Sequence, residues 1–122
     1  MNCPEHNIGL ISKATRYGRR YYCPVDGCTV VWWGGRNTTP ADEATRNARQ
    51  AAHLIFDALW HGNDNKERQR LYRKLASYLD RNVAETHIGL FDVATCEKVL
   101  EFAKEYKIPV DAITEGGRRV GN

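Results

Sequence analysis

No apolar run in this sequence approaches the roughly 20 residues that a membrane-spanning helix requires. The first residues also lack the apolar stretch of a secretory signal, so we expect a cytoplasmic protein. The chain has only 122 residues, which excludes large enzyme folds of roughly 250 residues such as a TIM barrel. Hydrophobic residues make up 42% of the chain and charged residues 27%, as in folded globular proteins. One compact domain or two very small ones are therefore expected.

Cysteine is scarce, with four residues in the chain, and their uneven spread is not typical of a disulfide scaffold. Cys3 and His6 form a C-x2-H step, and Cys23 and Cys28 form a C-x4-C step. Two short-spaced donor pairs, separated by a segment of hairpin length, predict one zinc site. Gly27 supplies the backbone freedom that the second turn needs.

The predicted zinc ion is structural, because four protein ligands leave no open position for water or substrate. The H-x-E element and the P-C-x-x-C spacing of zinc deaminases are both missing. The fourth cysteine, Cys96, falls on the apolar face of a predicted helix. We interpret it as a buried small hydrophobic residue rather than a ligand.

The sequence lacks a strong excess of either charge. Eighteen Lys and Arg residues against fifteen Asp and Glu residues give +3, and three thiolates (−3) with one zinc ion (+2) would leave +2. This net charge is much smaller than that of histone-like proteins, which bind DNA through a large excess of positive charge. Arg suits bidentate phosphate contacts, although a solvated surface explains any single cluster equally well. The Arg clusters are Arg16, Arg19 and Arg20; Arg68, Arg70 and Arg73; and Arg118 and Arg119.

The segment between the two donor pairs predicts a hairpin. Residues 8–15 read as a strand, residues 16–18 as the turn and residues 19–22 as the returning strand. A third β-rich run, residues 29–33, stops at two glycines. Three short antiparallel strands held by zinc at one end make a zinc ribbon.

Three helices are expected after the ribbon. For the first, Thr39 is the predicted N-cap, Pro40 the first helical residue and Asp42 the capping-box partner, and the helix stops at residues 60–62 with Gly62 as its cap. The second runs to about Leu79. The third begins after Asp92, and Pro109 breaks the pattern behind it. The inward-facing residues predicted for the second and third helices are Leu71, Tyr72, Leu75, Tyr78, Leu79, Val93, Cys96, Val99, Leu100, Ala103 and Tyr106.

The predicted fold class is thus α+β, with a three-stranded antiparallel zinc ribbon followed by a small three-helix domain. The expected boundaries are 1–36 for the ribbon, 37–110 for the helices and 111–122 for a flexible tail. Neither half has a large core, so the metal is expected to contribute much of the ribbon's stability.

Several segments together resemble a family of small zinc-finger-containing proteins of bacteriophages and bacteria. They are the Cys-Pro-x-His knuckle, residues 23–33, the His-x-x-F-D-x-L-W stretch at 53–60, and residues 87–96, within a resemblance that covers roughly residues 1–106. The family has Cys where this chain has His6. The resemblance implies a zinc ribbon and a cytoplasmic setting in a prokaryotic cell or phage-infected host, and no particular biochemical activity.

Residues 21–33 are also similar to the C-terminal zinc ribbons of bacterial type I topoisomerases, which bind single-stranded DNA. We therefore expect nucleic acid, and single-stranded DNA in particular, as the partner. Cations would attract the phosphates and aromatic side chains would stack on the bases. Coverage of a thin ribbon core explains the same aromatics equally well. The residues predicted to contact nucleic acid are Arg16, Arg19, Arg20, Tyr22 and Trp33.

The sequence bears on two other functions. Exposed aromatic and Arg side chains also form protein interfaces, so a phage or bacterial adaptor that docks on a host protein is the alternative hypothesis. An enzyme is disfavoured, because no Gly-rich phosphate loop or nucleophile–base pair occurs at diagnostic spacing. A row of His53, Asp57 and His61 could bind a second metal but is better explained as stabilising a helix end. The prediction is a non-catalytic protein whose oligomeric state the sequence does not fix.

Overall fold

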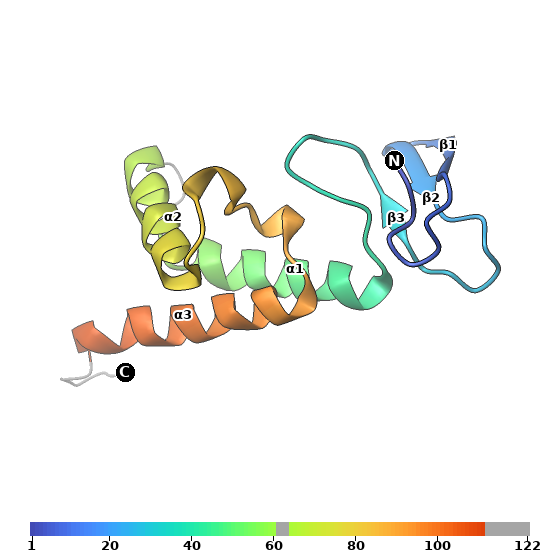
Figure 1. Ribbon diagram of the computed structural model, residues 1–122. Helices are drawn as coiled ribbons and strands as arrows, with labels where there is room; N and C mark the ends of the chain where they lie inside the picture. Colours follow the sequence, from blue (N-terminus) through green and yellow to red (C-terminus); the bar gives the residue numbers. More distant parts are fainter. Residues whose placement is uncertain (61–63, 112–122) are drawn as a thin grey trace.

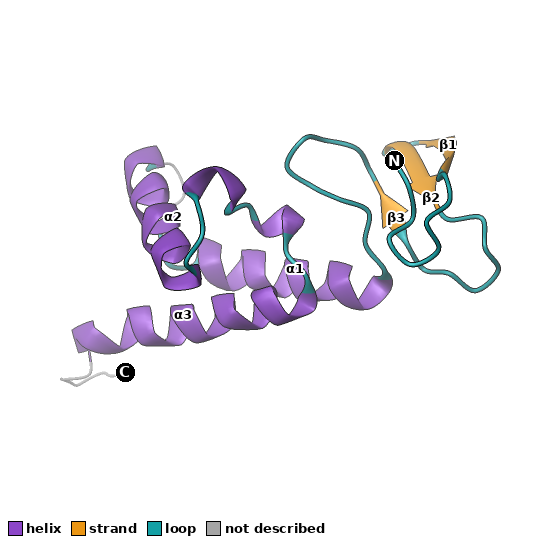
Figure 2. Ribbon diagram, in the orientation of Figure 1, coloured by secondary structure: helices purple, strands orange, loops and turns teal. Residues whose placement is uncertain are grey.

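The computed structural model describes residues 1–60 and 64–111, with side chains up to residue 106. A three-stranded antiparallel sheet is followed by three α-helices, which confirms the α+β class (Figure 1). Figure 2 shows the strands and the N-terminus at one end of the molecule and the helices packed together at the other. The predicted cap Gly62, His61 and residues 112–122 of the predicted tail lie outside the described residues. Asp111, the first residue of that tail, is instead the last residue of a helix.

The sheet has the strand order β1 (Ile11–Thr15), β2 (Gly18–Tyr22) and β3 (Val31–Trp32). The first strand begins three residues later than predicted. Residues 8 and 9 pair instead with the N-terminal segment, where Asn2 and Gly9 form an isolated bridge and the Cys3 N–H donates to the Ile8 carbonyl at 2.8 Å. The N-terminal turn is thereby tied to the root of the hairpin.

Helix α1 (Glu43–Asp57) begins later than the sequence pattern indicates. Its N-cap is Asp42, whose carboxylate accepts from the Thr45 N–H at 2.8 Å, so the prediction of Thr39 as cap is wrong. Residue Ala41 cannot be helical because its N–H and carbonyl both pair with Val31, at 3.1 and 3.0 Å. A long-range bridge to β3 thus overrides a local capping signal.

The end of α1 also differs from the prediction, since the helix stops at Asp57 rather than at residues 60–62. The chain tightens there, with the Leu59 N–H donating to the Phe56 carbonyl at 3.0 Å. The Trp60 indole N–H then donates to the Asp57 carboxylate at 3.2 Å. This side-chain bond closes the turn that the helix would otherwise have continued through.

Helix α2 (Asn65–Leu79) ends where predicted, and α3 (Val93–Asp111) begins behind the predicted cap, as Asp92 accepts from the Thr95 N–H at 2.8 Å. Contrary to prediction, α3 passes through Pro109. Proline has a helix-compatible φ, and its missing N–H removes one hydrogen bond from a helix that ends two residues later at Asp111. Two short 3₁₀ helices, η1 (Val83–Glu85) and η2 (Ile88–Leu90), join α2 to α3. None of the helices that the structure describes is both long enough and apolar enough to cross a membrane.

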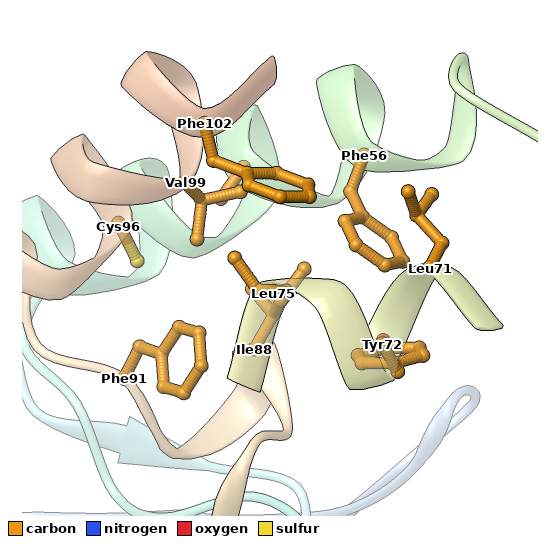
Figure 3. Close-up of a cluster of buried hydrophobic side chains, with 10 residues drawn as sticks. Phe56, Leu71, Tyr72, Leu75, Ile88, Phe91, Cys96, Val99 and Phe102 are labelled. Atoms are coloured by element: carbon orange, nitrogen blue, oxygen red, sulfur yellow. The ribbon is translucent and has the colours of Figure 1, made fainter. Parts of the chain in front are cut away.

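The helices enclose one hydrophobic core, shown in Figure 3. Phe102 is buried there, although the sequence pattern did not indicate it. Val93 and Leu100 are each 37% exposed, so the prediction that they face the core is wrong. Tyr78 is 38% exposed, and the edge of its ring packs against Phe102 with 5.4 Å between the ring centres. Cys96 is buried, as predicted. The buried members are Ala52, Phe56, Leu71, Tyr72, Leu75, Ile88, Phe91, Cys96, Val99 and Phe102.

The ribbon is fastened to this core through residues 37–42. The Arg49 guanidinium of α1 donates to the carbonyls of Thr39 and Phe91 and to the Thr39 hydroxyl, each at 2.8 Å. Next to it the Thr39 N–H donates to the Gly89 carbonyl at 3.2 Å. A Cβ on Gly89 would lie 2.5 Å from the Asn37 carbonyl oxygen. The close approach of two backbones therefore requires glycine at this position.

We predict that Gly89→Ala lowers the free energy of unfolding by about 1–3 kcal/mol, because the backbone at Asn37 has to move. Thermal or urea denaturation of the zinc-loaded protein measures the loss. Gly9→Ala is the matched control, since a Cβ there meets nothing within 4 Å. Equal stability of the two variants would contradict the close approach of Gly89 to the Asn37 carbonyl.

Candidate metal centre and nucleic-acid surface

Cys3, His6, Cys23 and Cys28 converge on one point. Their donor atoms all lie within 4.8 Å of one another. The first pair lies in the turn before β1, Cys23 directly follows β2, and Cys28 precedes β3. Cys3 and Cys23 are buried, Cys28 is half-buried and His6 is exposed. The positions of the four donor atoms confirm the prediction that these residues form one possible zinc site.

The separations between the donor atoms fit a tetrahedral zinc ion. With Zn–S bonds of about 2.3 Å and a Zn–N bond of about 2.0–2.1 Å, tetrahedral angles place two sulfurs about 3.8 Å apart and a sulfur and a nitrogen about 3.6 Å apart. The Cys3 and Cys28 sulfurs are 3.8 Å apart. His6 Nδ1 lies 3.5 Å from the Cys3 sulfur and 3.6 Å from the Cys23 sulfur. Three thiols and one imidazole are also a common structural zinc set.

Each donor pair is set by a tight turn that contains one residue in the left-handed region. Asn7, directly after His6, has φ of 54°, and its N–H donates to the Cys3 carbonyl at 2.8 Å. Gly27, directly before Cys28, has φ of 81°, as the sequence predicted. The N–H of Glu5 also lies 3.4 Å from the Cys3 sulfur. Such a bond stabilises negative charge on a ligand sulfur.

The Cys3 and Cys28 thiols do not ionise alike. Burial opposes ionisation of Cys3, but hydrogen bonds from His6 and the backbone lower its pKa to about 7. A backbone hydrogen bond favours the Cys28 thiolate, yet burial and the neighbouring sulfurs of Cys23 and Cys3 together raise the pKa of Cys28 to about 11. Three adjacent thiolates repel one another, and a divalent cation between them removes that repulsion. The donor set therefore fits a metal ion better than it fits three free thiols.

Cations dominate the hairpin beside this centre. From Asn7 to Val25 the chain contains four Lys and Arg residues and no Asp or Glu. Lys13 and Arg20 lie directly opposite each other in the β1–β2 register, an arrangement that costs stability through repulsion. The Arg20 guanidinium lies 5.2 Å from the centre of the Tyr22 ring on the same strand face.

The five residues predicted to contact nucleic acid do not form a single surface. Arg20 and Tyr22 lie together on one face of the hairpin, and Arg16 lies at its tip, 5.5 Å from the centre of the Tyr17 ring. Arg19 is on the opposite face, where it donates to the Ser12 hydroxyl at 3.0 Å. The structure thus places Arg19 and Arg20 on opposite faces of the hairpin.

Trp33 lies apart from the hairpin, in a cleft of about 240 Å³ between β3 and the helices. Its side chain is 50% exposed, and the cleft is also lined by Arg46 and His53. Partial desolvation lowers the pKa of His53 and so favours its neutral imidazole. Trp33 therefore offers an accessible aromatic face beside a cationic side chain.

Two structural residues were missed by the sequence reasoning. The sequence did not indicate that Arg49 is buried, because an Arg on an amphipathic helix is normally solvated. In the structure, burial lowers the pKa of Arg49. The carboxyl groups of Glu5 and Asp42 line the same cleft, and their interaction raises the pKa of Glu5. A contact between the N-terminal turn and the start of α1 depends on the tertiary fold.

The described residues contain one cluster of three or more donors placed for a metal ion. It consists of Cys3, His6, Cys23 and Cys28.

The chain belongs to a family of zinc-finger-containing domains, whose model matches residues 7–106. The matched region contains Cys23 and Cys28 and starts directly after His6. No curated protein and no solved structure matches the chain. The family and the donor geometry together define a zinc-finger protein with a single zinc site.

We predict that Cys23→Ala abolishes stoichiometric zinc binding and unfolds the ribbon, because two thiols and an imidazole remain at a site built for four donors. Elemental analysis of the purified protein and circular dichroism measure the two effects. Cys96→Ala is the control, since Cys96 lies in the helical core and its loss should leave one zinc ion per chain. Retained zinc with an unchanged melting curve in Cys23→Ala would disprove the ligand assignment.

Zinc affinity should fall as the pH is lowered from about 8 to about 6, because binding requires thiolates. Metal binding depresses the pKa of each thiol, so this stabilisation is full at high pH and is lost as protons return. The free Cys28 thiol, with a pKa of about 11, is still protonated at pH 8. Calorimetry in buffers of different ionisation enthalpy should therefore detect proton release on zinc binding. Binding without proton release would contradict thiolate coordination.

Proposed function

We propose that this protein is a non-catalytic zinc-ribbon module that binds nucleic acid, preferentially single-stranded DNA. The observation that supports it most directly is the Arg20 face of the hairpin, defined as Lys13, Arg20 and Tyr22. Two like charges are placed opposite each other in a stretch without carboxylates. Their repulsion is relieved when a phosphate backbone lies between them.

The chemistry of this face suits single strands. Tyr22 carries a cation beside its ring, and Tyr17 at the hairpin tip is 80% exposed. Base stacking on an exposed aromatic contributes about 1–3 kcal/mol per base and tolerates any sequence. In duplex DNA the bases are already stacked on one another, so these rings would gain little from it. The module is therefore proposed to bind strands through phosphates and base faces.

The zinc ion has a structural part in this proposal. With four protein donors it offers no open coordination position. It fixes the start of β1, the end of β2 and the start of β3, and so holds the hairpin in register. The cytoplasmic, prokaryotic or phage setting implied by the sequence resemblance belongs to this proposal as well.

The double variant Lys13→Gln, Arg20→Gln should bind an oligothymidine strand roughly tenfold or more weakly than the unchanged protein, because two phosphate contacts are lost. The salt dependence should also flatten, by roughly 0.7 per lost contact on a logarithmic scale. Fluorescence anisotropy of a labelled strand at two salt concentrations, with zinc-loaded protein, measures both.

The matched control is Lys98→Gln, Lys104→Gln on the exposed face of α3, which removes the same charge far from the hairpin. Equal weakening by both double variants would show that only net charge matters and would contradict the Arg20 face. Failure of single-stranded DNA, duplex DNA and RNA to bind at low salt would contradict the function itself. A host-protein adaptor would then be the better hypothesis.

A further inference from the structure

A cavity of about 400 Å³ lies in the helical half of the molecule, away from the ribbon. Helix α2 forms one side, and the η1 helix with the residues behind it forms the other. This volume is within the range of small-molecule sites. Its described lining residues are Arg68, Gln69, Tyr72, Arg73, Val83, Thr86 and His87.

The cavity concentrates positive charge and polar donors. Arg68 and Arg73 both line it, with Gln69 between them, and no carboxylate is among its described lining residues. Arg binds phosphate oxygens through paired N–H groups. Two guanidinium groups on the same wall raise the local positive potential and so attract an anion.

Arg68 is held in place before any ligand arrives. Its guanidinium carbon lies 4.8 Å from the centre of the Tyr72 ring and 5.9 Å from the centre of the Trp60 ring. Tyr72 is itself packed in the core, with its ring centre 4.5 Å from that of Phe56. A cation fixed in this way loses little entropy when it binds an anion.

The remaining lining suits a ring system rather than a bare inorganic anion. Val83 contributes an apolar side chain, and the His87 ring lies 6.4 Å from the Tyr72 ring, centre to centre. Apolar and aromatic walls with a few convergent polar groups are typical of sites for drug-sized ligands.

We propose that this cavity binds a phosphorylated nucleotide, with the phosphate on Arg68 and Arg73 and the base against Val83 and His87. The nucleotide is either free or the 5′-terminal residue of a strand. The proposal does not depend on the Arg20 face of the ribbon, because the two sets of residues lie in different halves of the molecule.

The experiment titrates zinc-loaded, full-length protein with adenosine monophosphate and with adenosine, using calorimetry and amide chemical shifts. Adenosine monophosphate should bind and shift amides of α2 and of residues 83–87, while adenosine should bind roughly tenfold or more weakly without its phosphate. Arg73→Gln should weaken the nucleotide by a similar factor. Lys13→Gln, Arg20→Gln should leave it unchanged, which separates this proposal from the ribbon function.

Arg70→Gln is the matched control, because Arg70 is exposed on the same helix and does not line the cavity. Val83→Trp provides a second variant that fills the cavity without changing charge, and it should also block binding. Circular dichroism confirms that each variant folds. Absence of nucleotide binding, or equal effects of the Arg70 and Arg73 variants, would overturn the proposal.

Two short strands distinguish the sources of the nucleotide. Tighter binding of a 5′-phosphorylated strand than of its 5′-hydroxyl counterpart, lost in Arg73→Gln, would support a strand end. Equal binding of the two strands, with adenosine monophosphate still bound in an Arg73-dependent way, would support a free nucleotide.

Discussion

The ribbon depends on the meeting of four donor atoms from separate turns at one point. Its own core is very small: the buried cluster consists of Cys3, Cys23 and Val30, with Cys28 among its half-buried neighbours. The side chains that fill the ribbon interior are thus largely the ligands themselves. Apolar burial on this scale cannot hold three short strands together. A metal ion that binds only the folded arrangement adds its binding free energy to folding, and the hairpin register follows from it.

A second constraint, the hydrogen bonding of Arg49, connects the ribbon to the helices. Arg49 lies partly buried and directs its guanidinium to the Thr39 and Phe91 backbones. A buried cation is costly unless its donors are satisfied, and here three bonds of 2.8 Å satisfy them. Removing either backbone segment would leave part of the guanidinium without partners. The connection between ribbon and helices is therefore specific rather than a loose linker, and Gly89 permits the close approach that it needs.

The parts of this fold that could be predicted from the sequence are those set by neighbours in the chain. The spacing of Cys23 and Cys28, the Asp92 cap and the stripe containing Leu71 and Leu75 are local patterns, and the structure confirms them. The errors arise where distant segments meet. The bridge from Ala41 to Val31 moves the start of α1. The positions of Arg49 and Phe102 depend on packing between elements that no local pattern describes. One error has a local cause. Adjacent residues of a strand point to opposite faces, so Arg19 and Arg20 could not belong to one contact surface.

Charge is distributed so that local fields matter more than the small net charge. The carboxylates of Glu5, Asp42 and Asp92 line one cleft near the junction of ribbon and helices, whereas the hairpin has none. Under the proposed function, an anionic strand would be attracted to the hairpin and repelled from that cleft. Screening at physiological salt limits such fields to about 8 Å. The proposed strand binding would therefore rest on direct contact with the hairpin cations. The β1–β2 register that places Lys13 opposite Arg20 is the proposed link between zinc and function.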